Sequence, residues 1–293
     1  MLLFHLALLV SGALNGAPTD SVIADKYDAP LRKVFSVREQ VRGVHPMFDR
    51  LCPIAIAEDG KFHVFEPDEA ASRYNLVRIA PAPFPVQVGL RASMPLDFYG
   101  NRATCCVTGE VFDEPDGYVM VLHEFVHCYQ WETCERELKE KLDVYREAMK
   151  RNDFMWELQH PFPYTDEAFT ATYGELLDAL GGNESQRVEQ LRARLKGKLA
   201  RADWEYMTWE EWKEGLARYL ENLVRRRLGL KENTGGLAKP FDRVTFYAGG
   251  ELLIRSYARS DPGIVERLPE LFDGIAGGGM PGEAPRASST PGR

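Results

Sequence analysis

The sequence predicts an α+β fold, with a small twisted β-sheet in the N-terminal part and a mainly helical C-terminal half. Between about residues 54 and 112, short apolar runs rich in β-branched and aromatic residues alternate with turn signals, which is typical of strands. Beyond residue 117, apolar residues recur at helical spacing instead. The chain of 293 residues, 44% hydrophobic and 27% charged, is long enough for one large domain or two closely packed subdomains.

The sheet region begins after a segment, residues 20–46, that we expect to be a linker followed by a short helix. The turn Asp59-Gly60 separates the first two predicted strands. In chain order, the predicted strands are Ile54–Ile56, Phe62–Phe65, Leu76–Ile79, Val86–Leu90 and Ala103–Phe112.

The first long helix is predicted from about Tyr118 to Trp131, with Asp116 as its N-cap. It is apolar almost all the way round, which predicts a buried helix. Thr208 and Glu211 have the spacing of a capping box at the start of a later helix. The remaining helices are predicted along Cys134–Met149, from Asp166 to Gly181-Gly182, along Val188–Leu199, from Thr208 to about Leu228, and from Pro240 through Tyr257.

The two ends of the chain differ from the rest. Residues 1–17 are predicted to be a signal peptide, because an apolar run, 1–10, precedes small residues suited to cleavage. That predicts a secreted or periplasmic protein. The run lacks a positively charged start and is interrupted by His5, so a cytoplasmic protein is the alternative. Residues 277–293 are rich in Gly, Pro and Ser and are predicted to be a disordered tail.

Charge and composition exclude several classes of partner. The net charge is −8 and the basic residues are mixed with acidic ones, so no basic stripe is present to bind nucleic acid. No later segment approaches the roughly 18 apolar residues of a transmembrane helix.

Five cysteines, an odd number, do not form a disulfide framework in a chain of this size. Cys105 and Cys106 should point to opposite faces of a strand, and one of them could bridge Cys52 or a helix cysteine in an exported protein. Cys128 and Cys134 lie too far apart along one helix to bridge each other. The alternative is that all five are buried as small hydrophobic residues.

The predicted buried helix contains the sequence His123-Glu124-Phe125-Val126-His127. Histidines at i and i+4 project from one face of a helix, so both imidazoles can bind one metal ion. Glu124 lies one step round the helix and could act as a general base on a water at the open metal position. Two histidines and a glutamate are costly to bury without partners. These residues predict a catalytic zinc site; histidines bonded within the core are the alternative.

A third ligand is needed, and no later histidine follows at short spacing. The segment Trp212-Lys213-Glu214-Gly215-Leu216-Ala217-Arg218-Tyr219 resembles the W-x-E-G-x-A/T-x-Y motif that follows HExxH in gluzincin peptidases. The resemblance covers only these two motifs and the order of sheet, metal helix and later helices. It implies a zincin-like fold, one Zn²⁺ per chain, and Glu214 as the third metal ligand.

Helical periodicity leaves the third ligand open. Trp212, Leu216 and Leu220 belong to an apolar stripe, whereas Glu214 falls on the opposite, charged face of the same helix, where it could be solvated. Glu175 and Glu167 are the alternative ligands. On this interpretation, residues 18–132 form a sheet subdomain that ends in the metal helix, and residues 133–276 form a helical subdomain that supplies the third ligand.

Hydrolysis at such a site also needs a donor for the developing oxyanion. Tyr247 is the candidate, by analogy with tyrosines in related families, and Tyr219 and His160 are alternatives. The strand at 103–111 resembles the zincin edge strand that pairs with extended substrate.

The sequence therefore predicts a zinc metallopeptidase that acts on a peptide or protein substrate. The metal ligands are His123, His127 and Glu214, and Glu124 and Tyr247 are catalytic. A zinc hydrolase of a non-peptide bond and a secreted zincin-fold binding protein with a structural or vestigial metal site are the alternatives. No motif encodes the cleavage specificity or the oligomeric state.

Overall fold

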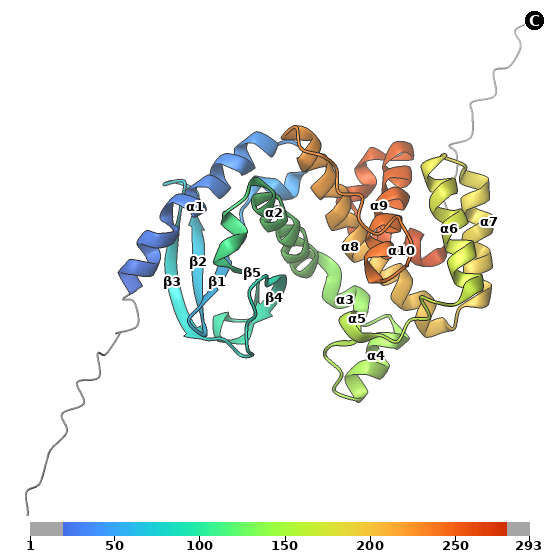
Figure 1. The fold of residues 1–293 in the computed structure, drawn as a ribbon, viewed down its shortest axis with the longest axis horizontal. Helices are drawn as coiled ribbons and strands as arrows, with labels where there is room; N and C mark the ends of the chain where they lie inside the picture. The colour runs from blue at the N-terminus through green and yellow to red at the C-terminus, as the bar shows by residue number, and fades with distance from the viewer. Residues whose placement is uncertain (1–19, 280–293) are drawn as a thin grey trace, which may run out of the picture.

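The computed structural model describes residues 20–279, so the predicted signal peptide, 1–17, and the predicted tail from residue 280 onwards lie outside the described residues. The fold is α+β, as expected: a five-stranded sheet lies in the N-terminal part, and the remainder is mainly helical (Figure 1). The segment expected to be a linker and a short helix is instead one 22-residue helix, α1 (Asp20–Val41). Its buried face, which includes Ile23, Leu31 and Phe35, packs against the sheet side of the molecule.

The sheet has the strand order β3-β2-β1-β5-β4, in which β1 and β5 are parallel and the other neighbours are antiparallel. The expected strand at Val86–Leu90 is wrong, since Gly89 has a positive φ of 96° and Val88 is 84% exposed. The strand β4 begins immediately afterwards and pairs with β5, so β5 is interior and the sheet edge next to α2 is β4. The strands are β1 (Ile54–Glu58), β2 (Lys61–Asp68), β3 (Arg73–Pro81), β4 (Arg91–Leu96) and β5 (Arg102–Thr108).

The two faces of the sheet belong to different clusters of buried side chains. Cys105 and Val107 on β5 join the main core, which also contains residues of α1 and α2. Cys106 joins a smaller cluster on the opposite face, with Phe62 and Val64. The expectation that Cys105 and Cys106 point to opposite faces is therefore confirmed.

The helical part begins with α2 and continues to the end of the described chain. The expected helix along Cys134–Met149 is interrupted at residues 140–142, between two short helices, and a π-helical turn, Trp131–Glu135, joins the first of them to α2. A C-terminal helix, α10, was not expected. The α-helices are α2 (Pro115–Gln130), α3 (Arg136–Lys139), α4 (Asp143–Lys150), α5 (Trp156–Gln159), α6 (Glu167–Gly181), α7 (Ser185–Lys198), α8 (Arg201–Arg227), α9 (Arg243–Ser260) and α10 (Leu268–Gly277).

Several helix starts differ from the expectations. The N-cap of α2 is Glu114 rather than Asp116, because Pro115 occupies the first turn. The helix α8 begins a full two turns before Thr208, whose hydroxyl bonds back to the carbonyl of Trp204 at 2.9 Å instead of capping. The Asp166 cap of α6 is confirmed by its bond to Phe169 N at 2.8 Å.

Helices α8 and α9 approach each other closely through glycines. A Cβ added to Gly215 would lie 2.6 Å from Gly250 Cα, and one added to Gly250 would lie 2.1 Å from the carbonyl oxygen of Glu211. The start of α9 is fixed by a capping box between Asp242 and Thr245 rather than by Pro240. The close approach of Gly215 and Gly250 places α9 beside α8, which also packs on α2.

Candidate metal centre

The helix α2 positions the two histidines. His123 and His127 are one turn apart, and their ring centroids are separated by 5.1 Å. Both are buried, as is Glu124 between them, so the motif lies inside the molecule as its apolar surroundings predicted. A polar cluster at this depth needs partners, which a second helix supplies.

That second helix is α8, which brings Glu214 to the histidines. Glu214 Oε2 lies 3.7 Å from His123 Nε2 and 3.4 Å from His127 Nε2. One ligand atom from each of the three residues falls within 4.8 Å of the other two, which is the geometry of a site that could hold a metal ion. The charged-face alternative for Glu214 is wrong, because its side chain is only 13% exposed.

Periodicity misplaced Glu214 because α8 is buried on nearly every side. Its polar face meets other elements rather than solvent: Glu211 pairs with the buried Arg192 at 2.9 Å and accepts a hydrogen bond from Tyr173. A helix surrounded in this way has no solvated face, and charge on its surface marks internal pairs.

Two further residues, which sequence reasoning missed, hold the imidazoles in place. His123 Nδ1 lies 3.0 Å from Glu221 Oε2, and His127 Nδ1 lies 2.8 Å from Gln130 Oε1. Each contact engages the nitrogen remote from Glu214, so the two Nε2 atoms are the ones that face the shared position. Only their spacing along the helices could have indicated that they lie near the site. Gln130 is three residues after His127, and Glu221 is two helical turns beyond Glu214.

Gln130 also links the two ligand helices. Its Nε2 donates to the carbonyl oxygen of Lys213 at 3.0 Å, directly before Glu214. The side chain is fully buried. It therefore ties the orientation of His127 to the backbone that carries the third candidate ligand.

The carboxylates and imidazoles of the site shift one another's pKa values. Burial lowers the pKa of His123, but its hydrogen bonds with Glu214 and Glu221 outweigh burial and raise it to about 10. Burial raises the pKa of Glu124, although the nearby His127 and His123 oppose the shift. A raised pKa is the property that a carboxylate needs in order to accept and release a proton near neutral pH.

Tyr247 and Arg243, one turn apart on α9, complete the surroundings of Glu214. Burial raises the pKa of Tyr247, and the charge of Glu214 and a hydrogen bond with it act in the same direction. The guanidinium of Arg243 lies over the Tyr247 ring, 5.2 Å from its centroid. Arg243 Nη1 is 3.8 Å from Glu214 Oε1 and 3.3 Å from Glu210 Oε2.

The alternative residues lie elsewhere. Glu175 pairs with Arg187 on α7 at 3.7 Å, and Glu167 is exposed in the first turn of α6. His160 bonds to Asp203 at 2.8 Å. The electrostatic neighbours of Tyr219 are Arg226, Arg255 and Glu251 rather than the histidines. None of these four belongs to the cluster formed by the described residues His123, His127 and Glu214.

All five cysteines are free thiols, so the suggested disulfide between β5 and another cysteine is wrong for this structure. Cys128, next to His127, is buried, and its Sγ lies 3.1 Å from Ser93 Oγ on β4.

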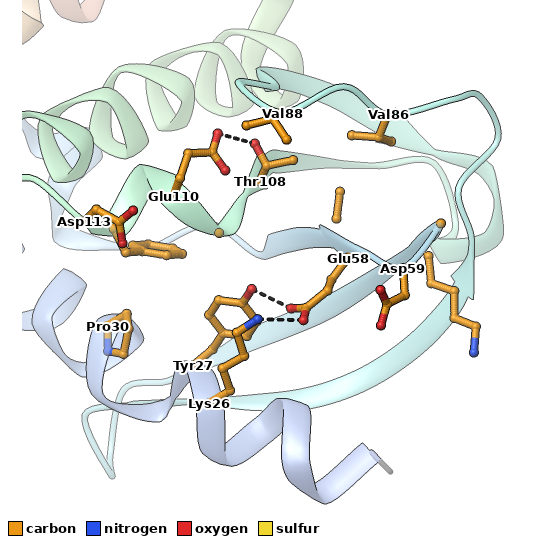
Figure 2. Close-up of a pocket in the computed structure, with 15 residues that line it drawn as sticks. Lys26, Tyr27, Pro30, Glu58, Asp59, Val86, Val88, Thr108, Glu110 and Asp113 are labelled. Carbon is orange, nitrogen blue, oxygen red and sulfur yellow. Dashed lines mark hydrogen bonds and ion pairs between the residues drawn. The ribbon is translucent and has the colours of Figure 1, made fainter. Parts of the chain in front are cut away.

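A separate cavity of about 640 Å³ lies between α1, the β1-β2 turn and the segment that follows β5 (Figure 2). Glu58 reaches across one wall to Lys26 and Tyr27, and Glu110 bonds to Thr108. None of the residues that line it belongs to the cluster of His123, His127 and Glu214.

Comparisons with known proteins add no assignment: no family profile matches the chain, and no curated protein and no solved structure matches it. Within residues 20–279, none of the helices combines the length and the apolar character required to span a bilayer.

Proposed function

We propose that the protein is a zinc-dependent peptidase whose metal ligands are His123, His127 and Glu214. The observation that carries the proposal is the convergence of two imidazoles from α2 and one carboxylate from α8 at a single buried position. Glu214 is 87 positions after His127 in the sequence, so the contact joins distant parts of the chain. Both motifs that resemble those of gluzincins contribute a residue to it.

The donor set fits zinc in particular. Two histidine nitrogens and one glutamate oxygen form a His₂Glu set, which catalytic zinc sites use while keeping a fourth position open. Calcium and magnesium prefer oxygen ligands alone, so imidazoles argue against them. A zinc ion at this position supplies Lewis-acid chemistry, since it polarises a substrate carbonyl and lowers the pKa of a water.

Residues of the chain would supply proton transfer, stabilisation of the oxyanion and orientation of the imidazoles. Glu124 takes one proton from the attacking water, whose oxygen forms a bond to the carbonyl carbon, and passes that proton to the amine nitrogen as the carbon–nitrogen bond breaks. Tyr247 donates a hydrogen bond to the oxygen that gains negative charge. Gln130 and Glu221 keep both imidazoles in the tautomer that leaves Nε2 free for the metal.

The test is hydrolysis of a broad peptide library by the zinc-loaded wild type and by Glu124→Gln. We expect the substitution to lower kcat by at least about a hundredfold while the zinc content is unchanged, because general acid and base catalysis contributes this much. Glu132→Gln, an exposed glutamate on the π-helical turn, is the matched control and should retain activity. Full activity in Glu124→Gln would refute the proposed role.

A further inference from the structure

The candidate metal centre is largely buried, and its neighbour Arg243 on α9 is more exposed than the three candidate ligands. The histidine side chains are only 6% and 8% exposed, that of Glu214 is 13% exposed, and that of Arg243 is 29% exposed. Exposure therefore increases from the histidines through Glu214 to Arg243. Arg243, whose Nη1 lies 3.8 Å from Glu214 Oε1, is therefore the most exposed of these four side chains and adjoins the candidate ligand set.

Arg243 keeps unused hydrogen-bond donors. Its two contacts with carboxylates, to Glu210 and Glu214, both use Nη1. Neither is bidentate, and Nε and Nη2 have no hydrogen-bond partner among residues 20–279. A guanidinium has five N–H donors in a fixed planar fork, so one edge remains available for a planar anion.

Two other cations near the centre are more buried than Arg243. Lys213 lies between Glu135 at 3.1 Å and Glu157 at 2.6 Å. Arg218 makes its hydrogen bonds through Nη1, to the carbonyl oxygens of Asn233 and Gly235, and its side chain is only 7% exposed with Nε 3.4 Å from Glu221. Arg243 is therefore the most accessible of these three cations to an incoming ligand.

The Tyr247 ring holds this fork in place. The guanidiniums of Arg243 and Arg218 lie 5.2 Å and 5.7 Å from its centroid. Stacking on an aromatic ring restricts the guanidinium without using its N–H groups, which favours recognition of a carboxylate through two parallel hydrogen bonds.

We propose that Arg243 is a specificity residue that binds a carboxylate of the substrate beside the cleaved bond. This inference rests on the proposed peptidase function and deepens it. The carboxylate has two sources with the same chemistry: the C-terminus of a short peptide, which would make the enzyme an exopeptidase, or an Asp or Glu side chain within a longer chain.

The experiment uses three forms of one peptide that the wild type cleaves near its C-terminus: the free acid, the C-terminal amide, and the amide with Asp as the final residue. Binding is measured by calorimetry on zinc-loaded Glu124→Gln, which separates recognition from turnover, and kcat/KM is measured on the wild type. Each measurement is repeated with Arg243→Gln and Arg243→Lys. Arg255→Gln is the matched control, because Arg255 lies on the same helix and also pairs with two glutamates.

We expect the free acid to bind at least about tenfold more tightly than the amide, because a hydrogen bond to a charged group is worth this much. Arg243→Gln should reduce the ratio to about one, Arg243→Lys should restore part of it, and Arg255→Gln should preserve it. Rescue of the amide by Asp identifies a side-chain carboxylate as an alternative ligand, and absence of rescue identifies the C-terminus.

Equal binding of acid, amide and Asp-amide by the wild type would overturn the inference and leave the peptidase proposal intact. An equal loss for all three forms in Arg243→Gln would also overturn it, because it would assign Arg243 to the support of Glu210 and Glu214. If the wild type cleaves no peptide at all, the proposed function itself fails.

Discussion

At the scale of single residues, the orientation of the candidate ligands depends on side chains that lie outside the two sequence motifs. Gln130 accepts from His127 and donates to the backbone before Glu214, so one amide fixes parts of two helices. An isolated histidine has several rotamers, and the amide favours the rotamer of His127 that faces Glu214, as Glu221 does for His123. The candidate site thus includes two residues, Gln130 and Glu221, that bond to the histidines and lie outside both sequence motifs.

Replacement of Gln130 tests this role. Gln130→Leu should weaken zinc binding about 10- to 100-fold, because loss of a hydrogen bond to a ligating histidine has that effect on metal affinity. The measurement is competition for zinc against a chromophoric chelator. Gln130→Glu keeps an acceptor for His127 and should bind zinc more tightly than Gln130→Leu. Equal affinities for the wild type and Gln130→Leu would contradict the orienting role.

At the scale of elements, the sequence predicted the class of fold and most strands and helices, because their apolar spacing reflects local burial. Ile54–Ile56, Phe62–Phe65 and Leu76–Ile79 lie within β1, β2 and β3. The expected strand at 86–90 is wrong, since Val86 and Leu90 pack from a loop against the smaller cluster that contains Phe62 and Val64, whereas Val88 is exposed. Tertiary packing rather than local propensity decides such segments.

The same limit applies to α8. Its buried polar side chains made Glu214 look solvated, and only the three-dimensional arrangement shows that the helix is surrounded. That His123 and His127 share one face of a helix could be predicted because i and i+4 spacing is independent of tertiary structure. The contribution of Gln130 and Glu221 could not, since one depends on a rotamer and the other on how α8 crosses α2.

The crossing of α8 and α9 is set by glycine. Gly250→Ala should lower the free energy of unfolding by about 1–3 kcal/mol or more, because its Cβ would overlap the carbonyl of Glu211 and force the helices apart. Gly197→Ala, in the last turn of α7 with nothing within 4 Å of an added Cβ, should instead leave the free energy of unfolding unchanged or raise it by up to about 1 kcal/mol. Urea unfolding of both variants measures the difference; equal stabilities would contradict the packing argument.

At the scale of the whole molecule, contacts between distant parts of the chain join the sheet side to the C-terminal helices. His45, before the first strand, is buried, accepts a hydrogen bond from Met47 N at 3.1 Å and lies 3.2 Å from the carbonyl oxygen of Val265. With Nδ1 as acceptor, Nε2 carries the proton and donates to Val265. The neutral imidazole satisfies both contacts, and burial lowers its pKa below the usual value.

A lowered pKa in the folded state predicts that acid weakens this connection. Between the folded and unfolded pKa values the unfolded chain binds the extra proton, so stability falls as pH drops below about 6.5. His45→Asn keeps a capping acceptor but cannot titrate, and its stability should fall less between about pH 7 and pH 5. Urea unfolding at both pH values provides the comparison; identical pH dependences would contradict the prediction.

The candidate metal centre is itself such a connection, because its ligands come from α2, beside the sheet, and from α8 in the helical part (Figure 1). The central claim is that both elements hold one zinc ion. Its most direct test is elemental analysis of purified wild type, His127→Ala, Glu214→Ala and, as a control, Glu175→Ala. We expect about one zinc per chain in the wild type and in Glu175→Ala, and little in the other two. A folded wild type without zinc, or zinc retained in Glu214→Ala, would contradict the account.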